Sequence, residues 1–320
     1  MKKILLLFIS ICIFFKTNAQ IKWKEVTSEY AITNKSVKVF ESEGNYNDSA
    51  FRAFYVQINT KDKSLSLGMD TTVKRRITPL QFNARLNNPL VVVNASFFEF
   101  SNNTNVNVIV KEGNTVAYNM HNIPGKGKRD TLTYLHILGS AIGMSKLNKL
   151  DIGYTYTDSS LANVYFQSEP LIPFRDSSAT LTLSNTHLKN LKPWKVNWAV
   201  GGGPVLIRDA QIHITNEEER KFAGKAINDR HPRTAMGYTK SGDLIIMAIQ
   251  GRMKGIAVGT TLGETATLLF DLGCYEAINL DGGGSSCMLV NGKETIKPSD
   301  PTGERPVPAV FYVKNGKRLR

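Results

Sequence analysis

The residues best suited to chemistry lie in one short stretch, residues 277–292, which reads Ala-Ile-Asn-Leu-Asp-Gly-Gly-Gly-Ser-Ser-Cys-Met-Leu-Val-Asn-Gly. A short apolar run carries one carboxylate, Asp281, into a loop that contains Gly282, Gly283, Gly284 and Ser285. Glycines let a ligand approach the backbone, whose N–H groups can then bind anionic oxygens. The stretch therefore suggests a site for a phosphate-bearing ligand. The alternative is a tight strand connection that binds nothing.

Two well-known glycine loops do not fit this stretch. A Walker loop and a dinucleotide-binding fingerprint both lead into a helix. Here the residues after the glycines are Cys-Met-Leu-Val, followed by the turn pair Asn291 and Gly292. That pattern predicts a strand and a hairpin, with a first strand over residues 277–280 and a second over residues 287–290.

Two other segments end or interrupt apolar runs with residues that could face a ligand. Asn94 closes a buried-looking strand and is followed by the aromatic pair Phe97 and Phe98. Asn94 is either a substrate contact or a turn residue, and the aromatics belong either to the core or to a sugar platform. Further along, Gly202 and Gly203 lie in a glycine triplet within a strand pattern, which requires either a bulge or a close approach to a ligand.

A predicted hairpin places two arginines near each other. Arg233 stands at the entrance of its first strand and Arg252 just past the end of the second, so both lie near the same end. Guanidinium groups suit phosphate oxygens, although either arginine alone could form a surface ion pair. His231 precedes the first strand and has an unperturbed pKa near neutrality.

The clearest predicted helix spans residues 255–274 and ends at Gly273. Glu264 follows Thr261 by three residues, which matches a capping box, a structural role that competes with catalysis. The helix leads directly into the strand that ends at Asp281. Because the connection is short, the helix start and the strand end are expected at the same edge of the layer.

The pattern of strands and helices along the rest of the chain predicts an α+β fold. Alternating apolar and polar residues over 21–74 predict antiparallel strands. Thr78 and Pro79 predict the start of a short helix over residues 80–86. We therefore expect twisted, largely antiparallel or mixed sheets with a few packed helices, and the glycine-rich loops gathered at one edge.

The first residues predict export. Residues 1–19 begin with Lys2 and Lys3, followed by an apolar run, Lys16 and small residues before Gln20, as in a secretory signal peptide. We divide the chain into this signal peptide, a strand-rich N-terminal extension (residues 20–85) and a catalytic domain (residues 86–320). The apolar run is too short for a stable membrane span, so the product is expected to be periplasmic or secreted, without a span after signal removal.

Charge and composition narrow the ligand classes. The chain carries 40 Lys and Arg against 27 Asp and Glu, and 37 basic residues remain after signal removal. Such an exported protein favours anionic ligands. The basic residues are scattered, so no nucleic acid partner is expected.

Cysteine and histidine usage argues against two kinds of scaffold. The five histidines stand apart and no Cys/His spacing indicates zinc. Only Cys274 and Cys287 follow the signal peptide, so a single disulfide is conceivable but a disulfide scaffold is not. No cofactor is required by the pattern, although a divalent cation beside Asp281 is compatible with it.

Taken together, the motifs resemble the phosphodiester glycosidase, or uncovering-enzyme, domain family, which includes N-acetylglucosamine-1-phosphodiester α-N-acetylglucosaminidases and bacterial exported proteins. The matching blocks occur in the family's order over residues 90–311: Asn-Ala-Ser-Phe-Phe (94–98), Gly-Gly-Gly-Pro-Val-Leu-Ile (201–207), His-Pro-Arg-Thr-Ala (231–235), Gly-Arg (251–252), Thr-Leu-Gly-Glu (261–264) and Asn-Leu-Asp-Gly-Gly-Gly-Ser-Ser (279–286). One departure is Ala95, where the family usually has glycine. The extension lies outside the resemblance.

The resemblance implies hydrolysis of a bond between a sugar and a phosphodiester. Such a reaction needs charge neutralisation at the phosphate and carboxyl groups near the glycosidic bond. We expect Asp281 and Glu264 as the carboxyl pair and Arg233 as the phosphate clamp. The remaining candidates are expected as substrate contacts: Asn94, Gly202, Gly203, His231, Arg252, Thr261, Gly282, Gly283, Gly284 and Ser285.

Two other functions are compatible with the same residues. One is a metal-dependent phosphodiesterase that cuts the P–O bond, with the metal held by Asp281. The other is a non-catalytic surface protein that binds anionic glycans.

Overall fold

The computed structural model describes residues 21–125 and 132–316. The predicted signal peptide lies outside these residues. Among the described residues every pair of adjacent strands runs antiparallel, which confirms the predicted antiparallel sheets. Strands predominate and helices are few, so the fold is compatible with the α+β class but is mainly β.

Two large sheets carry most of the strands. In spatial order, the eight-stranded sheet contains β1 (Lys22–Glu25), β2 (Val37–Glu43), β3 (Ala53–Asn59), β19 (Asp243–Ile249), β18 (Arg233–Thr239), β20 (Cys274–Asn279), β16 (Val205–Arg208) and β17 (Gln211–Ile212). The seven-stranded sheet contains β14 (Lys192–Trp194), β12 (Val164–Gln167), β11 (Leu150–Tyr156), β10 (Gly139–Met144), β15 (Trp198–Gly201), β6 (Ile109–Lys111) and β7 (Asn114–Ala117).

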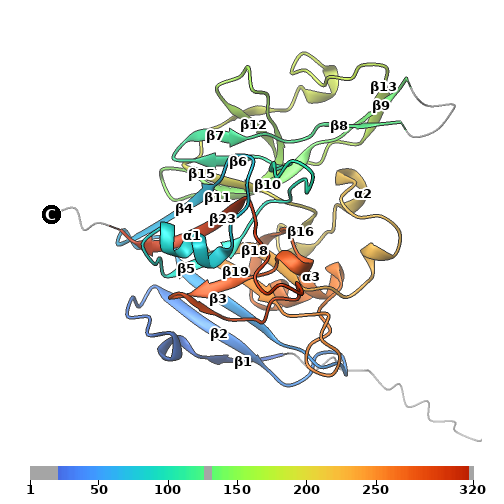
Figure 1. Ribbon diagram of the computed structural model, residues 1–320. Helices are drawn as coiled ribbons and strands as arrows, with labels where there is room; N and C mark the ends of the chain where they lie inside the picture. Colours follow the sequence, from blue (N-terminus) through green and yellow to red (C-terminus); the bar gives the residue numbers. More distant parts are fainter. Residues whose placement is uncertain (1–20, 126–131, 317–320) are drawn as a thin grey trace, which may run out of the picture.

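Two smaller sheets complete the strand framework. The five-stranded sheet contains β22 (Lys293–Glu294), β21 (Met288–Val290), β5 (Val91–Asn94), β23 (Ala309–Asn315) and β4 (Leu65–Thr71). The three-stranded sheet contains β13 (Phe174–Asp176), β9 (Tyr134–His136) and β8 (Asn122–Pro124). In Figure 1, β4, β5 and β23 lie between the strands of the two large sheets.

The helices are short. They are α1 (Pro79–Arg85), α2 (Asn216–Glu219) and α3 (Leu262–Asp271), with 3-10 turns η1 (Thr27–Tyr30), η2 (Thr186–Leu188), η3 (Gly224–Ile227) and η4 (Gly283–Ser285). Helix α1 begins as predicted, with Thr78 as N-cap and a capping box to Gln81. Helix α3 is shorter than the predicted 255–274, because the Thr261 capping box starts it. Gly273, with φ of +78°, follows its C-cap.

The hydrophobic core lies between the sheets. Successive side chains along a strand point to opposite faces of its sheet, so they belong to different core clusters. Val91 and Val93 of β5 face the main core, whereas Val92 faces a smaller cluster under α1. Likewise, Ile246 of β19 faces the main core and Met247 faces α3. This alternation is the pattern of strands that are buried on both faces.

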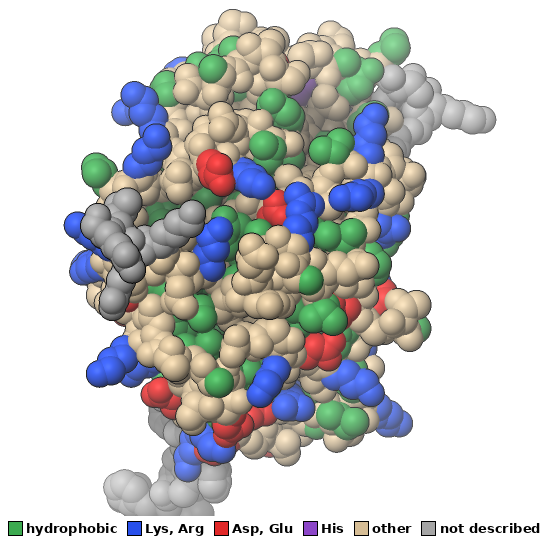
Figure 2. Space-filling model, turned by 60° about the vertical axis from the view of Figure 1, so that its left-hand side comes forward, with side chains coloured by type: hydrophobic (Ala, Val, Ile, Leu, Met, Phe, Trp, Pro, Cys, Tyr) green, Lys and Arg blue, Asp and Glu red, His purple; other side chains and the backbone are tan. Residues whose placement is uncertain are grey.

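The N-terminal extension is built into the same sheets as the rest of the chain. Strand β3 pairs with β19 along its whole length, and β4 pairs with β23 near the C-terminus. Strands β1, β2, β3 and β4 therefore precede the region of family resemblance and complete two of its sheets. On the face shown in Figure 2, Lys and Arg side chains are interspersed with Asp and Glu. No helix in the described ranges is long and apolar enough to cross a membrane.

Candidate functional site

Asp281 follows β20 directly, and the end of β5 holds its backbone on both sides. The Asp281 N–H donates to the Ala95 carbonyl (3.0 Å), and Asn94 Nδ2 donates to the Asp281 carbonyl (2.6 Å). Asn94 Oδ1 accepts from Thr234 Oγ1 (2.8 Å) and from the Cys287 N–H (3.1 Å). Asn94 is completely buried, so it positions the backbone of Asp281 and does not face a substrate.

The environment of the Asp281 carboxyl group makes it a competent acid or base. Burial raises its pKa from 3.8 to about 7. A hydrogen bond from the Ser285 side chain, the charge of Arg305 and the Gly282 N–H act in the opposite direction. A group with a pKa near 7 can both lose and accept a proton at neutral pH.

A cavity of about 250 Å³ opens beside Asp281 and is rich in cationic side chains. It is lined by Phe97, Phe222, Ala226, His231, Arg233, Arg252, Asp281, Gly282 and Gly283. Asp281 is the only carboxyl group among these lining residues. The cavity therefore combines one titratable acid with a positive wall.

Arg233 is the most deeply buried of the cations, with a relative exposure of 3%. Its guanidinium donates to the Thr260 carbonyl (3.1 Å) and the Asp229 carbonyl (3.2 Å), and lies over the Phe222 ring at 5.5 Å. Burial, together with the charge of Arg252, lowers the pKa of Arg233 to about 10. Within the described residues no carboxylate forms an ion pair with Arg233. A buried guanidinium held only by neutral carbonyls is suited to an anionic ligand.

Arg252 and His231 complete the positive wall. The register of β18 against β19 pairs Arg233 with Ile249, which brings Arg252 to the same end of the hairpin, as the sequence predicted. Arg252 Nη2 lies 3.4 Å from His231 Nδ1. Burial and the charges of the two arginines lower the pKa of His231, so the imidazole is neutral near pH 7.

The glycines of the Asp281 loop serve mainly for close packing. A Cβ on Gly282 would lie 2.9 Å from the Pro232 carbonyl oxygen, and one on Gly283, with φ of +61°, would lie 3.0 Å from Arg252. The Gly283 N–H already donates to the Pro232 carbonyl (2.8 Å). The Ser285 N–H donates to Gly282 (3.1 Å). The expectation that these two N–H groups bind a ligand is therefore wrong, because backbone carbonyls already accept from them.

The other glycine segment crosses from one large sheet to the other. Gly202 and Gly203 link β15 to β16, and Gly203 donates to the Asn279 carbonyl at 2.7 Å. A Cβ on Gly202 would lie 2.5 Å from the same oxygen. Neither glycine lines the cavity. Close backbone approach explains them, and the register shift of β16 against β20 lies beyond the triplet, between Val205 and Ile207.

Glu264 does not line the cavity that contains Asp281. It accepts from the Thr261 N–H (2.9 Å) in the α3 capping box, from Asn47 Nδ2 (3.1 Å) and from Arg230 Nε (3.1 Å). Burial acts to raise its pKa, but the bonds from Arg230, Thr261 and Asn47 hold it below its ordinary value. The structure thus brings Asp281 and Arg233 together, and it places Glu264 and Thr261 at the helix start with Arg230.

Several cavity residues carried little or no sequence signal. Phe97 lines the cavity, whereas Phe98 belongs to the core cluster under α1. Phe222 follows a one-turn helix, α2. A signal was available for Phe97, which follows a strand-end asparagine, but none for Phe222.

Cys274 and Cys287 are both free and buried. They belong to different clusters, one under α3 and one under α1. Burial raises the pKa of the Cys274 thiol to about 12, so it is protonated at neutral pH. Among the described residues no group of three or more His, Cys, Asp and Glu side chains could hold a metal ion.

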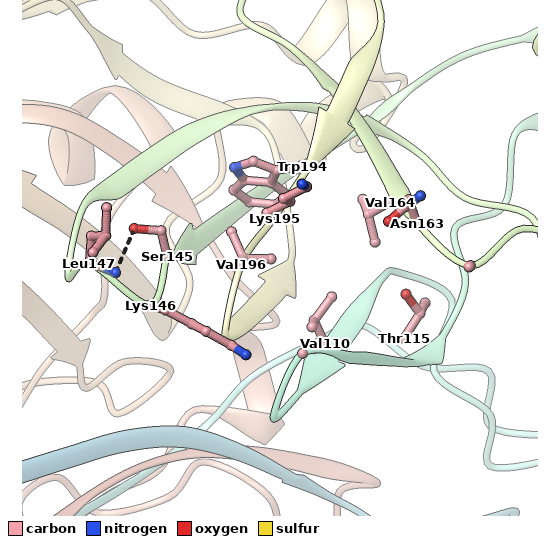
Figure 3. A pocket seen from close by; sticks show the side chains of 12 residues that line it. Val110, Thr115, Ser145, Lys146, Leu147, Asn163, Val164, Trp194, Lys195 and Val196 are labelled. Carbon is pink, nitrogen blue, oxygen red and sulfur yellow. Dashed lines mark hydrogen bonds between the residues drawn. The ribbon is translucent and has the colours of Figure 1, made fainter.

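A second and larger cavity, of about 490 Å³, lies on the seven-stranded sheet (Figure 3). Its walls include Val110, Val196 and Trp194, with Lys146 and Lys195 nearby. None of its lining residues is Asp, Glu, His or Arg. It therefore offers no carboxyl or imidazole group for acid–base catalysis. The cavity beside Asp281 is the candidate active site because it brings together the motif residues Asp281, Arg233 and Arg252.

Comparison with known proteins agrees with this fold. The family model described as phosphodiester glycosidase matches residues 87–314, and the chain belongs to that family. This result confirms the resemblance drawn from the motifs.

Individual relatives match over shorter stretches. Over 106 residues the chain is 34% identical to the N-acetylglucosamine-1-phosphodiester alpha-N-acetylglucosaminidase of Mus musculus and 33% identical to that of Homo sapiens. Each alignment covers 33% of this chain and 20% of the relative. The catalytic domain of the zebrafish enzyme of that name superposes with a TM-score of 0.60 at 18% identity, over 93% of this chain and 89% of the other. That likeness shows a shared fold.

Proposed function

We propose that this protein is an exported hydrolase that cleaves the glycosidic bond between a sugar and a phosphodiester. The observation that carries the proposal is one cavity that holds the Asp281 carboxyl group, with a pKa of about 7, beside two guanidinium groups. Membership of the phosphodiester glycosidase family supports it. The signal-like N-terminal segment supports export.

The cationic wall would hold the phosphate. Arg233 is fixed by two carbonyls and Arg252 by its neighbour His231, so both guanidinium groups can face one phosphodiester. Their attraction grows as the bond breaks, because the leaving phosphate gains negative charge in the transition state. Phe97 and Phe222 then provide apolar surface for the sugar ring.

Asp281 acts as the base in this proposal. Its carboxylate accepts a proton from a water molecule, the water oxygen forms a bond to the anomeric carbon, and the bond from that carbon to the phosphate oxygen breaks. The electron pair leaves with the phosphate, which departs as a monoester. A phosphate is a weak base, so it needs less protonation than the leaving group of an ordinary glycoside.

The other site residues act indirectly. Asn94 and Ser285 hold Asp281, one through its backbone and the other through its carboxyl group. Glu264 is already bonded to Arg230, Asn47 and the Thr261 N–H, so we assign it to the start of α3 and not to the reacting groups.

The proposal is tested by incubating the purified protein with a panel of sugar-1-phosphodiesters and nucleotide sugars. The fragments are identified by mass spectrometry. Free sugar and a phosphate monoester are expected, and Asp281→Asn should reduce the rate by about 10²-fold or more, the scale of losing a positioned acid or base. Release of a sugar phosphate that a chelator abolishes would instead indicate a metal-dependent phosphodiesterase. Tight binding without turnover would indicate a glycan-binding protein.

A further inference from the structure

Lys221 lies against the wall of the candidate active site. Its side chain runs over Gly203, where an added Cβ would lie 2.6 Å from Lys221 Cε. The ammonium group lies 5.4 Å from the centre of the Phe97 ring, and Phe97 lines the cavity. A positive charge therefore stands directly behind one aromatic wall of the site.

The charge of Lys221 has no paired carboxylate. Across residues 21–125 and 132–316, no Asp or Glu oxygen lies within 4.0 Å of its ammonium nitrogen. Burial lowers the pKa of Lys221, and the charge of Glu219 acts in the opposite direction. An ammonium group in such surroundings gains from any anion that comes close.

Glu219 is the nearby acid, but its oxygens bind other groups. One oxygen accepts from Ser140 Oγ (2.6 Å) and the Ser140 N–H (3.2 Å). The other accepts from the Val205 N–H (2.8 Å) and Thr215 Oγ1 (2.8 Å). With four donors on its two oxygens, Glu219 stabilises the chain crossing between the large sheets and leaves Lys221 without a direct partner.

The loop that carries Lys221 is fixed in place. The Asn216 side chain accepts from the Phe222 N–H (2.9 Å) and donates to the Phe222 carbonyl (2.9 Å). The Phe97 and Phe222 rings meet edge to face with centroids 6.2 Å apart. Lys221 lies over the first ring and Arg233 over the second, so two cations are held on one aromatic pair.

We propose that Lys221 determines specificity for a charged leaving group: from behind Phe97, its ammonium adds positive potential to the cavity as a whole, and favours sugar phosphodiesters over neutral glycosides. This proposal rests on the proposed function. The physical reason is that Coulomb attraction acts over several ångströms where water is excluded, so Lys221 need not touch the phosphate. A neutral substrate gains nothing from it.

The test compares two substrates with the same sugar, the methyl phosphodiester and the 4-nitrophenyl glycoside. For Lys221→Met we expect kcat/KM for the phosphodiester to fall tenfold or more, with the nitrophenyl glycoside changed less than twofold. Lys221→Arg should recover most of the loss, because it keeps the charge. Lys225→Met removes an exposed lysine from the same loop and should change neither rate. Thermal unfolding checks that each variant is folded.

Two results would overturn the proposal: an equal loss on both substrates, which indicates a structural role only, or no loss on the phosphodiester. If the wild type hydrolyses neither compound, the proposed function fails separately. In that case the role of Lys221 is tested by calorimetry, which compares the binding of a uridine diphosphate sugar to the wild type and to Lys221→Met. Weaker binding by Lys221→Met, with a smaller dependence on salt, would support its role, and unchanged binding would refute it.

Discussion

The side-chain amide of Asn94 donates a 2.6 Å hydrogen bond to the main-chain carbonyl of Asp281, 187 residues further along the chain. This bond joins the end of β5 in the five-stranded sheet to the end of β20 in the eight-stranded sheet. Thr234 at the start of β18 donates to the same asparagine. One buried amide therefore ties together the strand ends that form the floor of the site.

Replacing Asn94 with alanine is expected to cost stability and activity together. The change leaves the Asp281 carbonyl and the Cys287 N–H without their side-chain partner, and leaves the Thr234 hydroxyl only its 3.3 Å bond to Ser286 Oγ. Each unsatisfied buried group costs about 1–3 kcal/mol. We expect a loss of at least about 2 kcal/mol in the free energy of unfolding, measured by denaturant titration. We also expect kcat/KM to fall about tenfold or more, because Asp281 loses its fixed position.

Asn83→Ala is the matched control. Asn83 is also buried, but it bonds to Asn88 beside α1, away from the cavity. Its loss should lower stability without a specific change in kcat/KM at a temperature where the variant is folded. Equal effects of the two variants on catalysis would contradict the role assigned to Asn94.

The raised pKa of Asp281 predicts how stability depends on pH. Its folded pKa of about 7 lies above its ordinary value of 3.8, so the folded state binds the extra proton between these two values. The contribution of this group to stability is therefore present at low pH and is lost as pH rises toward 7. Asp281→Asn cannot ionise, so its stability relative to wild type should increase between pH 4 and 8. Denaturant titrations across that range measure the difference, and a constant difference would contradict the assigned pKa.

The same group predicts the pH dependence of the reaction. A base must be deprotonated to work, so kcat/KM should rise with pH through an apparent pKa near 7 and then level off. Initial rates at several pH values, with substrate well below KM, give this profile. A rate that instead falls above pH 7 would assign Asp281 as an acid.

Arg233 is predicted to tolerate lysine poorly. Its guanidinium uses Nε and Nη2 to bind two carbonyls, which a single ammonium group cannot reproduce while also facing a phosphate. We expect Arg233→Lys to raise KM for a sugar phosphodiester by about ten- to a hundredfold, the scale of one charge-assisted hydrogen bond. The exposed Arg252 serves as comparison, and Arg252→Lys should have the smaller effect.

Glu264→Gln separates a structural role from a catalytic one. Glutamine can still accept from the Thr261 N–H, but the ion pair with Arg230 (2.5 Å) is lost. We expect a lower melting temperature and a change in kcat/KM of less than about threefold, since the carboxylate does not line the cavity. A loss of about 10²-fold in kcat, the effect of removing a positioned base, would restore Glu264 to the reacting pair.

Local sequence patterns predicted the parts of the site whose position depends on neighbouring residues. The N-cap Thr78 with Pro79, and the capping box of Thr261 with Glu264, mark the starts of α1 and α3. The Asn291 and Gly292 pair marks the turn between β21 and β22. The hairpin of β18 and β19 places Arg233 and Arg252 at one end because its turn fixes the register.

Contacts between distant segments were less predictable. Asn94 could not be recognised as a positioning residue, because its partners are main-chain groups of Asp281 and Cys287. Almost any residue type supplies such main-chain groups, so the sequence contains no pattern that reveals the contact. Phe222 faces the cavity only because Asn216 holds its backbone in a tight loop. The predicted pairing of Glu264 with Asp281 relied on the start of the helix and the end of the strand lying at the same edge of the sheet. Two residues at the same edge can still lie outside a common cavity.

In the proposed reaction, water attacks the anomeric carbon and not the phosphorus. Hydrolysis of a sugar-1-phosphodiester in H₂¹⁸O, followed by mass spectrometry of both products, tests it directly. We predict that ¹⁸O appears at the anomeric hydroxyl of the released sugar and that the phosphate monoester is unlabelled. Label on the phosphate, with the sugar unlabelled, would contradict the mechanism assigned to Asp281, Arg233 and Arg252.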